Sequence, residues 1–138
     1  MQSLLTPSTH PITIPPHPTP EFKRRTLECD VIGVVETWLT DDISDAELKV
    51  SGYELYRKDR TESKGGGIIL YVKESLHSEL CDDLTNSDFE ESLWCKVQSS
   101  NGEGQLIVGV CYRCPTSSSE NNARLLELFE SANRRSQN

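Results

Sequence analysis

The chain lacks a long apolar run, since no stretch approaches the roughly 18 consecutive apolar residues of a membrane-spanning helix. Its N-terminus also lacks the basic segment and the sustained apolar segment of a secretory signal. The five cysteines form no even set of the kind that disulfide frameworks use. We therefore predict an intracellular protein, nuclear or cytoplasmic, with free thiols and no membrane partner.

Positive charge is also scarce, because 14 Lys and Arg stand against 22 Asp and Glu, giving a formal net charge of −8. Phosphate binding is normally driven by clustered Lys and Arg, so charge alone does not favour tight DNA binding by this chain. A nuclease is not excluded, because a metal site needs carboxylates whatever the charge elsewhere. The length of 138 residues is suited to one small domain.

Proline is almost confined to the start of the chain, where residues 1–28 hold six of the seven prolines. Proline has no backbone donor and biases the preceding residue toward extended geometry, which excludes a helix or a central strand there. We predict a disordered, Pro-rich leader over 1–28 and one domain over 29–138. The alternative function of the leader is as a ligand for a Pro-recognising module, although well-placed basic flanks next to a PxxP core are lacking.

Five runs of the predicted domain are typical of strands, and the first is apolar on both faces, as in a buried strand. Asn101-Gly102 predicts a hairpin turn between the last two runs, because both residues tolerate positive φ. Residues 74–91 hold seven acidic residues and no Lys or Arg, so we predict a solvated connection rather than a calcium loop. The five predicted strands are Val31–Val35, Gly52–Arg57, Ile68–Val72, Ser92–Val97 and Gln105–Tyr112.

The periodicity becomes helical after Pro115. Ser117 and Glu120 fit a capping box, and Arg134 and Arg135 suit the negative end of a helix dipole. The predicted apolar face consists of Leu125, Leu128, Phe129 and Ala132. Five strands followed by one helix predict an α/β protein with an antiparallel-rich sheet.

Two predicted strands end in residues that suggest chemistry. Glu36 closes the first strand, where a carboxylate either faces solvent at a sheet edge or binds a cation. Tyr112 and Arg113 end the last strand, and both side chains can donate hydrogen bonds to phosphate oxygens. Taken singly, each residue is better explained as an ordinary polar end of a strand.

Taken together, these segments resemble the endonuclease/exonuclease/phosphatase superfamily, and specifically the endonuclease domain of non-LTR retrotransposons. Residues 30–39 are similar to the family strand that ends in a metal-ligand glutamate and an ETWL signature. The segment from Gly52 to Ile68, with its R-x-D-R and GGG elements, and the segment 108–115, with Y-R-x-P, follow in the family's order. The resemblance covers about residues 29 to 135 and predicts a partial, truncated two-sheet α/β sandwich.

The resemblance implies a Mg²⁺-dependent phosphodiesterase that cuts DNA, of the kind joined to reverse transcriptases. It implies that Glu36 is a Mg²⁺ ligand, that Tyr112 is a catalytic residue at the scissile phosphate, and that Arg113 binds substrate. In such enzymes the metal stabilises charge on the phosphate while a carboxylate activates water.

The family's metal-site Asn, its later G-D-x-N segment and its terminal S-D-H have no counterparts in this chain. Groups that act as a unit lose nearly all rate enhancement together, so we expect the chain to be inactive alone. We also expect it to supply one sheet of the sandwich, exposing an inner face with Ile32, Val34, Ile69 and Val108. A missing half-domain or a second copy would cover that face. The alternative is a non-catalytic protein-interaction module or a transposon-derived relic.

Two short motifs have other interpretations. Cys111-x-x-Cys114 has the spacing of a redox or half-zinc motif, but a second ligand pair is missing and Pro115 indicates a turn. Gly65-Gly66-Gly67 lacks the Lys-Ser/Thr of a phosphate-binding P-loop, so we predict a turn there.

Overall fold

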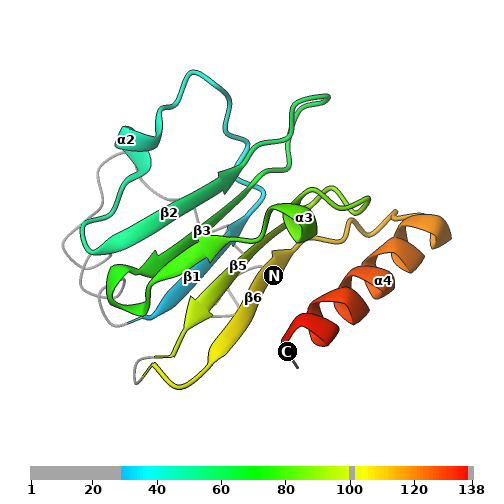
Figure 1. Ribbon diagram of the computed structural model, residues 1–138. Coiled ribbons are helices and arrows are strands. Elements are labelled where there is room, and N and C mark those ends of the chain that lie inside the picture. The colour runs from blue at the N-terminus through cyan, green and yellow to red at the C-terminus, as the bar shows by residue number, and fades with distance from the viewer. Residues whose placement is uncertain (1–28, 100–101, 137–138) are drawn as a thin grey trace.

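A computed structural model describes residues 29–99 and 102–136, so the predicted leader 1–28 and the turn residue Asn101 lie outside the described residues. The described chain contains six strands, three α-helices and one 3₁₀ turn (Figure 1). The elements are β1 (Val31–Val35), α2 (Asp45–Leu48), β2 (Tyr53–Lys58), β3 (Ile68–Lys73), η1 (Glu74–Leu76), β4 (Ser78–Leu80), α3 (Asp82–Thr85), β5 (Ser92–Gln98), β6 (Gln105–Cys111) and α4 (Ser119–Ser136).

The strands form two antiparallel sheets of three strands each. Sheet A has the order β1-β3-β2, and sheet B has the order β4-β5-β6. β5 and β6 pair as a hairpin, with Ser92 opposite Cys111 and Gln98 opposite Gln105. All five predicted strands are present, which confirms the α/β class with antiparallel sheets.

The inner faces of the two sheets pack against each other and form the main core. Strands β3 and β5 lie in the middle of their sheets and alternate inward and outward side chains, as strands must. The fully buried inward residues are Ile68, Leu70, Val72, Leu93, Cys95 and Val97. Residues of the edge strands β1 and β6, such as Val31, Val35, Val108 and Val110, pack partly buried against them.

The expectation that the chain supplies a single sheet is therefore wrong. Ile69 lies on the outer face of sheet A, where it packs with Tyr53 and Tyr71 and is only 1% exposed. Ile32 and Val34 pack against the same outer cluster, which the segment after β1 covers with Leu39, Leu48 and Val50. Val108 contributes to the core between the sheets. Sheet B consists of three strands that are consecutive in the chain, whereas sheet A is closed by the pairing of β1 with β3.

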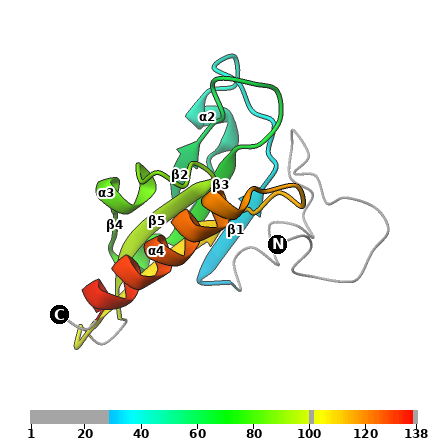
Figure 2. The same ribbon diagram turned by 90° about the vertical axis from the view of Figure 1, so that its right-hand side faces the viewer.

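Helix α4 covers the outer face of sheet B, as Figures 1 and 2 show from two directions. Leu128 and Ala132 are buried there against Trp94, which is 6% exposed. Phe129, on the predicted apolar face, is 46% exposed and meets the Trp94 ring edge-to-face at 6.5 Å between centroids. Among the described residues, none of the helices has the length and apolarity needed to cross a membrane.

The start of α4 lies one residue from its predicted cap. The Ser118 hydroxyl accepts a hydrogen bond from the Asn121 amide at 3.0 Å, so Ser118 rather than Ser117 holds the N-cap position. The Ser117 hydroxyl instead accepts from the Asn121 side chain at 2.9 Å. Arg134 and Arg135 do lie in the last turn, as predicted. Arg135 also pairs with Asp83, which joins α4 to α3.

The acidic segment 74–91 is more ordered than a solvated connection. It contains η1, β4 and α3, and it buries Cys81, Leu84, Thr85 and Phe89. The Thr85 hydroxyl accepts a hydrogen bond from the Trp94 amide at 2.9 Å, so the segment is fixed to sheet B. All of its acidic residues except Glu91 are exposed, and their charge conceals in the sequence the three apolar residues that anchor the segment.

Candidate functional site

The ends of strands from both sheets meet at one end of the sandwich. β1 and β2 run in the same direction, since Val35 and Lys58 both lie opposite Ile68, the first residue of β3. The arrowheads of β1, β2 and β6 point the same way in Figure 1. Lys58 joins the two sheets at this end, because its ammonium donates to the Thr85 carbonyl and, at 3.3 Å, to the Ser92 carbonyl.

We call the residues gathered at this end the rim cluster. They come from the turn after β1, the loop between β2 and β3, the residue before β5 and the segment after β6. The rim cluster consists of Glu36, Trp38, Arg60, Gly65–Gly67, Glu91, Tyr112, Arg113 and Cys114. The structure thus brings the three sequence-predicted site residues, Glu36, Tyr112 and Arg113, to the same end of the molecule.

The turn that carries Glu36 is strained. Glu36 has φ 57° and Trp38 has φ 56°, both in the left-handed region that L-residues avoid. Backbone hydrogen bonds from Thr37 and Trp38 to the carbonyls of Gly67 and Gly66 hold the turn, at 3.3 and 2.9 Å. The Trp38 indole N–H donates to Glu36 Oε2 at 3.1 Å. Glu36 is therefore an exposed carboxylate whose orientation is fixed by its own turn.

An ion pair lies beside this turn. Arg60 Nη2 is 2.6 Å from Glu91 Oε1, and Arg60 Nε donates to the same oxygen at 2.8 Å. The two side chains are 28% and 18% exposed, so the pair is largely shielded. Arg60 also donates to the Lys64 carbonyl at 3.0 Å. The pKa of Arg60 is raised, first by the hydrogen bond with Glu91 and also by nearby charges that include Glu36.

Glycine is required beneath this ion pair. Gly66 has φ +68°, and a Cβ there would lie 2.3 Å from both Arg60 Nε and Glu91 Oε1. Gly67 has φ +92°, and its Cβ would meet the Thr37 hydroxyl at 2.4 Å. The predicted turn at the three glycines is confirmed. The absence of side chains there also leaves room for the Arg60–Glu91 pair and for the Thr37 hydroxyl.

Tyr112 and Arg113 reach the rim from β6. The Tyr112 amide donates to the Glu91 carbonyl at 2.9 Å, which places the tyrosine beside the ion-pair residue. Tyr112 is half-buried, and Arg113 is exposed with a long contact of 3.4 Å to the Cys114 carbonyl. Hydrogen bonds with Thr116 lower the pKa of the exposed Cys114 thiol, with help from Arg60 and against Glu36.

The rim cluster offers two cationic and two anionic side chains, but it is not a complete magnesium site. Mg²⁺ commonly takes one or two carboxylates together with waters and substrate phosphates. Glu36 supplies one carboxylate, whereas Arg60 engages that of Glu91 and places a positive charge nearby. In the part of the chain that the structure describes, no three His, Cys, Asp or Glu side chains form a group able to hold a metal. These residues therefore do not fit Mg²⁺ by themselves.

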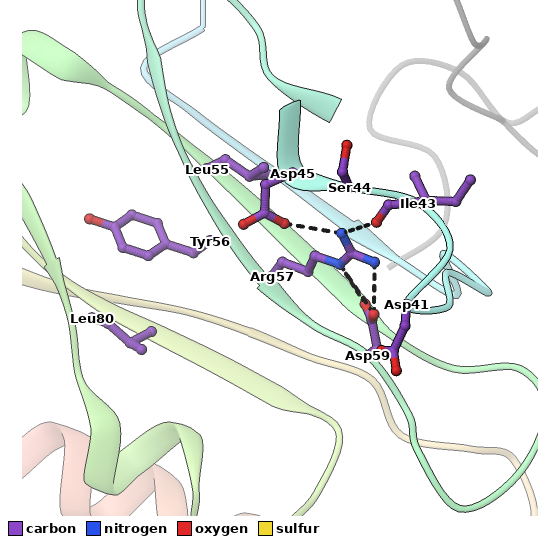
Figure 3. A pocket seen from close by; sticks show the side chains of 9 residues that line it. All are labelled: Asp41, Ile43, Ser44, Asp45, Leu55, Tyr56, Arg57, Asp59 and Leu80. Atoms are coloured by element: carbon purple, nitrogen blue, oxygen red, sulfur yellow. Dashed lines mark hydrogen bonds and ion pairs between the residues drawn. The ribbon is translucent and has the colours of Figure 1, made fainter. Parts of the chain in front are cut away.

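An open hollow of about 510 Å³ lies beside β2, between the segment before α2 and Leu80 of β4. Arg57 lies at its centre (Figure 3). Arg57 pairs with Asp59 at 2.9 Å and with Asp45 at 3.0 Å, and it donates to the carbonyls of Thr40 and Ile43. The hydrogen bond with Asp59 is the largest cause of the raised pKa of Arg57. The guanidinium is thus used to hold the segment before α2, and the hollow has a structural explanation.

Comparison with known proteins gives no relative: no protein-family model, no curated protein and no solved structure matches this chain. Membership of the endonuclease/exonuclease/phosphatase superfamily, with its magnesium and DNA, therefore stays a prediction.

Sequence reasoning missed two residues of the rim cluster. Glu91 falls in the predicted acidic connection, and Arg60 belongs to the R-x-D-R segment, to which the sequence assigns no role. Their partnership spans 31 positions and has no local periodicity. The one available signal was Gly66, since a run of three glycines indicates a backbone that side chains must approach closely.

Proposed function

We propose that residues 29–136 form part of a phosphodiester-binding site of the DNA-endonuclease type, and that this chain alone does not cleave DNA. The observation that carries the proposal is the convergence of Glu36, Tyr112 and Arg113 at one end of a two-sheet sandwich. The resemblance to retrotransposon endonucleases supports the same roles. In this proposal the protein acts inside the cell, in the nucleus or the cytoplasm, and its partner is DNA.

Each role follows from the chemistry of the side chain. The exposed Arg113 guanidinium and the Tyr112 hydroxyl would donate hydrogen bonds to phosphate oxygens. Glu36 would be one carboxylate ligand of a magnesium ion. Because the described residues provide no complete ligand set, the proposed activity is binding without turnover.

Two assays on the full chain test this proposal. Supercoiled plasmid with Mg²⁺ should remain un-nicked, and nicking that disappears in Glu36→Ala would overturn the claim of inactivity. At low salt, Arg113→Ala should weaken binding of a short DNA duplex about tenfold or more, since a hydrogen bond to a charged group contributes about 1.5–3 kcal/mol. The matched control is Arg134→Ala, an exposed arginine in the last turn of α4, which should leave affinity unchanged. Equal losses from both variants would show non-specific attraction instead.

The lineage has a separate test that needs no protein. The genomic sequence after codon 138 should encode G-D-x-N and S-D-H segments, in frame or out of frame, ahead of a reverse transcriptase. A following sequence that contains neither segment would argue against a recently intact element and would favour a relic.

A second candidate function is protein interaction through the edges of β1 and β6. These edges lie on one side of the sandwich, since a Cβ on Gly33 would lie 2.7 Å from the Val110 side chain. The 5 residues of β1 and the 7 of β6 include no charged residue and no proline, although 26% of the chain is charged. The opposite edges carry Glu54, Arg57 and Lys58 on β2 and Glu79 on β4. Charges are the usual protection of an edge strand, so the unprotected side suits pairing.

The proposed occupant of this side is a second copy of the chain. Antiparallel self-pairing about Val108 would place Leu106 beside Val110 of the second copy, and uncharged strands meet without like-charge repulsion. Leu106 is 61% exposed and would become covered. Sedimentation equilibrium should show a dimer that Leu106→Lys dissociates, whereas Glu54→Lys on the charged edge should leave it intact. A monomer at all concentrations would refute this candidate.

A further inference from the structure

The most exposed aromatic side chain of the described residues lies in the rim cluster. Trp38 is 63% exposed, whereas the other tryptophan of the chain, Trp94, is 6% exposed under α4. Leaving a tryptophan in water forgoes the burial that makes this residue stabilising in a core. An exposed tryptophan in a fixed position is therefore of interest as a contact surface.

The Trp38 ring is held in place by three contacts. Its indole N–H donates to Glu36 Oε2 at 3.1 Å, and its backbone amide donates to the Gly66 carbonyl at 2.9 Å. The ring rests on Gly65, because a Cβ there would lie 3.2 Å from indole Cε2. A side chain at Gly65 would therefore push the ring away from the loop.

The backbone that carries the exposed Trp38 ring is strained. Glu36 and Trp38 both have positive φ, at 57° and 56°. The left-handed region is unfavourable for L-residues, and such strain concentrates at functional sites. The turn thus holds a large apolar ring outward at an energetic cost that packing inward would avoid.

A guanidinium lies beside the ring. The position of a Gly65 Cβ is 3.5 Å from Arg60 Nη1 as well as 3.2 Å from the indole, so both groups lie against the same backbone residue. An aromatic face next to cationic donors matches a nucleotide, in which a flat base is joined to an anionic phosphate. Arg60 and Arg113 balance Glu36 and Glu91, so the rim cluster has no net positive charge to attract phosphate by itself.

We propose that Trp38 is a stacking platform for a nucleobase of single-stranded or unpaired DNA bound at the rim cluster. This inference rests on the proposed function and names the part of the nucleic acid that the site grips. Because charges at the rim cancel, stacking provides most of the affinity and the salt dependence is shallow. An oligonucleotide with bases should therefore bind far better than its phosphate backbone alone.

The test uses the full chain with a fluorescently labelled oligothymidylate and an abasic oligomer of the same length. Trp38→Ala should weaken binding of the oligothymidylate by about fivefold to a hundredfold, the range expected for the loss of one stacked base. Trp38→Phe should retain most of the affinity, because phenylalanine also offers a flat face, and it guards against a loss caused by misfolding. The matched control is Leu126→Ala on α4, which has the same 63% exposure and should have no effect.

Intrinsic fluorescence gives a second readout that a purely structural Trp38 would not move. The oligothymidylate should quench the exposed Trp38 and leave the buried Trp94 unaffected, so Trp38→Phe should abolish the quenching. If both oligomers bind equally and Trp38→Ala changes nothing, stacking is refuted while phosphate binding at the rim stands. If neither oligomer binds but the DNA duplex does, stacking alone is refuted; if none of the three binds, both the stacking and the proposed function are refuted.

Discussion

The Gly66→Ala substitution should lower the free energy of unfolding by an amount that can be worked out from its contacts. Replacing Gly66 with alanine forces a Cβ to within 2.3 Å of Arg60 Nε and Glu91 Oε1, at a backbone φ of +68°. The side chains of the ion pair must move, because the backbone on which the alanine sits is fixed by the turn. Gly52 offers a matched control, since it has φ +87° and nothing within 4 Å of its Cβ position.

The two glycine variants share one cost and differ in another. Each should lose about 1–2 kcal/mol for placing an L-residue in the left-handed region. Gly66→Ala should lose about 2 kcal/mol more, because hydrogen bonds to charged groups contribute about 1.5–3 kcal/mol. The pair is only 28% and 18% exposed, so water does not readily replace these contacts.

Urea denaturation of both variants measures this difference directly. The excess cost of Gly66→Ala over Gly52→Ala should nearly disappear when Arg60→Met and Glu91→Gln are present, because the displaced interaction is then already gone. Equal free energies of unfolding for the two glycine variants would refute the packing of the ion pair on Gly66. So would an excess that persists without the pair.

Three further predictions concern the core and the thiols. Gly109→Ala should lower the free energy of unfolding by about 1–3 kcal/mol through overpacking, because its Cβ would lie 2.3 Å from the Trp94 ring; an unchanged urea midpoint would contradict this. Iodoacetamide near pH 7.5 should alkylate Cys114, which is exposed with a pKa lowered by hydrogen bonds with Thr116, well before Cys95, as mass mapping would show. Burial raises the pKa of Cys95 from 9.0 to about 12, so its thiol is protonated in the fold at pH values that ionise it in the unfolded chain. Its contribution to stability is thus complete below pH 9 and is lost as the pH rises toward 12, and urea midpoints should fall less steeply over that window in Cys95→Ala.

The strands were predictable because their signals are local. Val31–Val35 is a short, β-branched run that ends at a polar residue, and the structure has β1 over the same five residues. The helix was predictable from the spacing of Leu125, Leu128 and Ala132, although its cap moved from Ser117 to Ser118. Ser117, Ser118 and Ser119 are consecutive, and the side chain of any of them could cap a helix, so the sequence does not identify the cap.

The number of sheets was not predictable in the same way. Sheet membership depends on which strands pair, and β1 pairs with β3 across more than thirty intervening residues. The three-residue strand β4 is too short to show alternation, yet it completes sheet B. The candidate site was predicted where strand ends carry polar residues, at Glu36 and Tyr112. The Arg60–Glu91 pair was missed, because only the folded chain brings these residues together.

Amide chemical shifts test the central claim most directly, namely that the rim cluster is the nucleic-acid-binding end of this protein. A ¹H–¹⁵N spectrum of the full chain should be recorded at low salt while a short single-stranded oligonucleotide is added. The predicted result is a set of shifts confined to the rim cluster, including Trp38, Gly66 and Arg113 and the indole N–H of Trp38. Shifts that centre on α4 or the β2–β4 side, or a spectrum that does not change, would contradict the account.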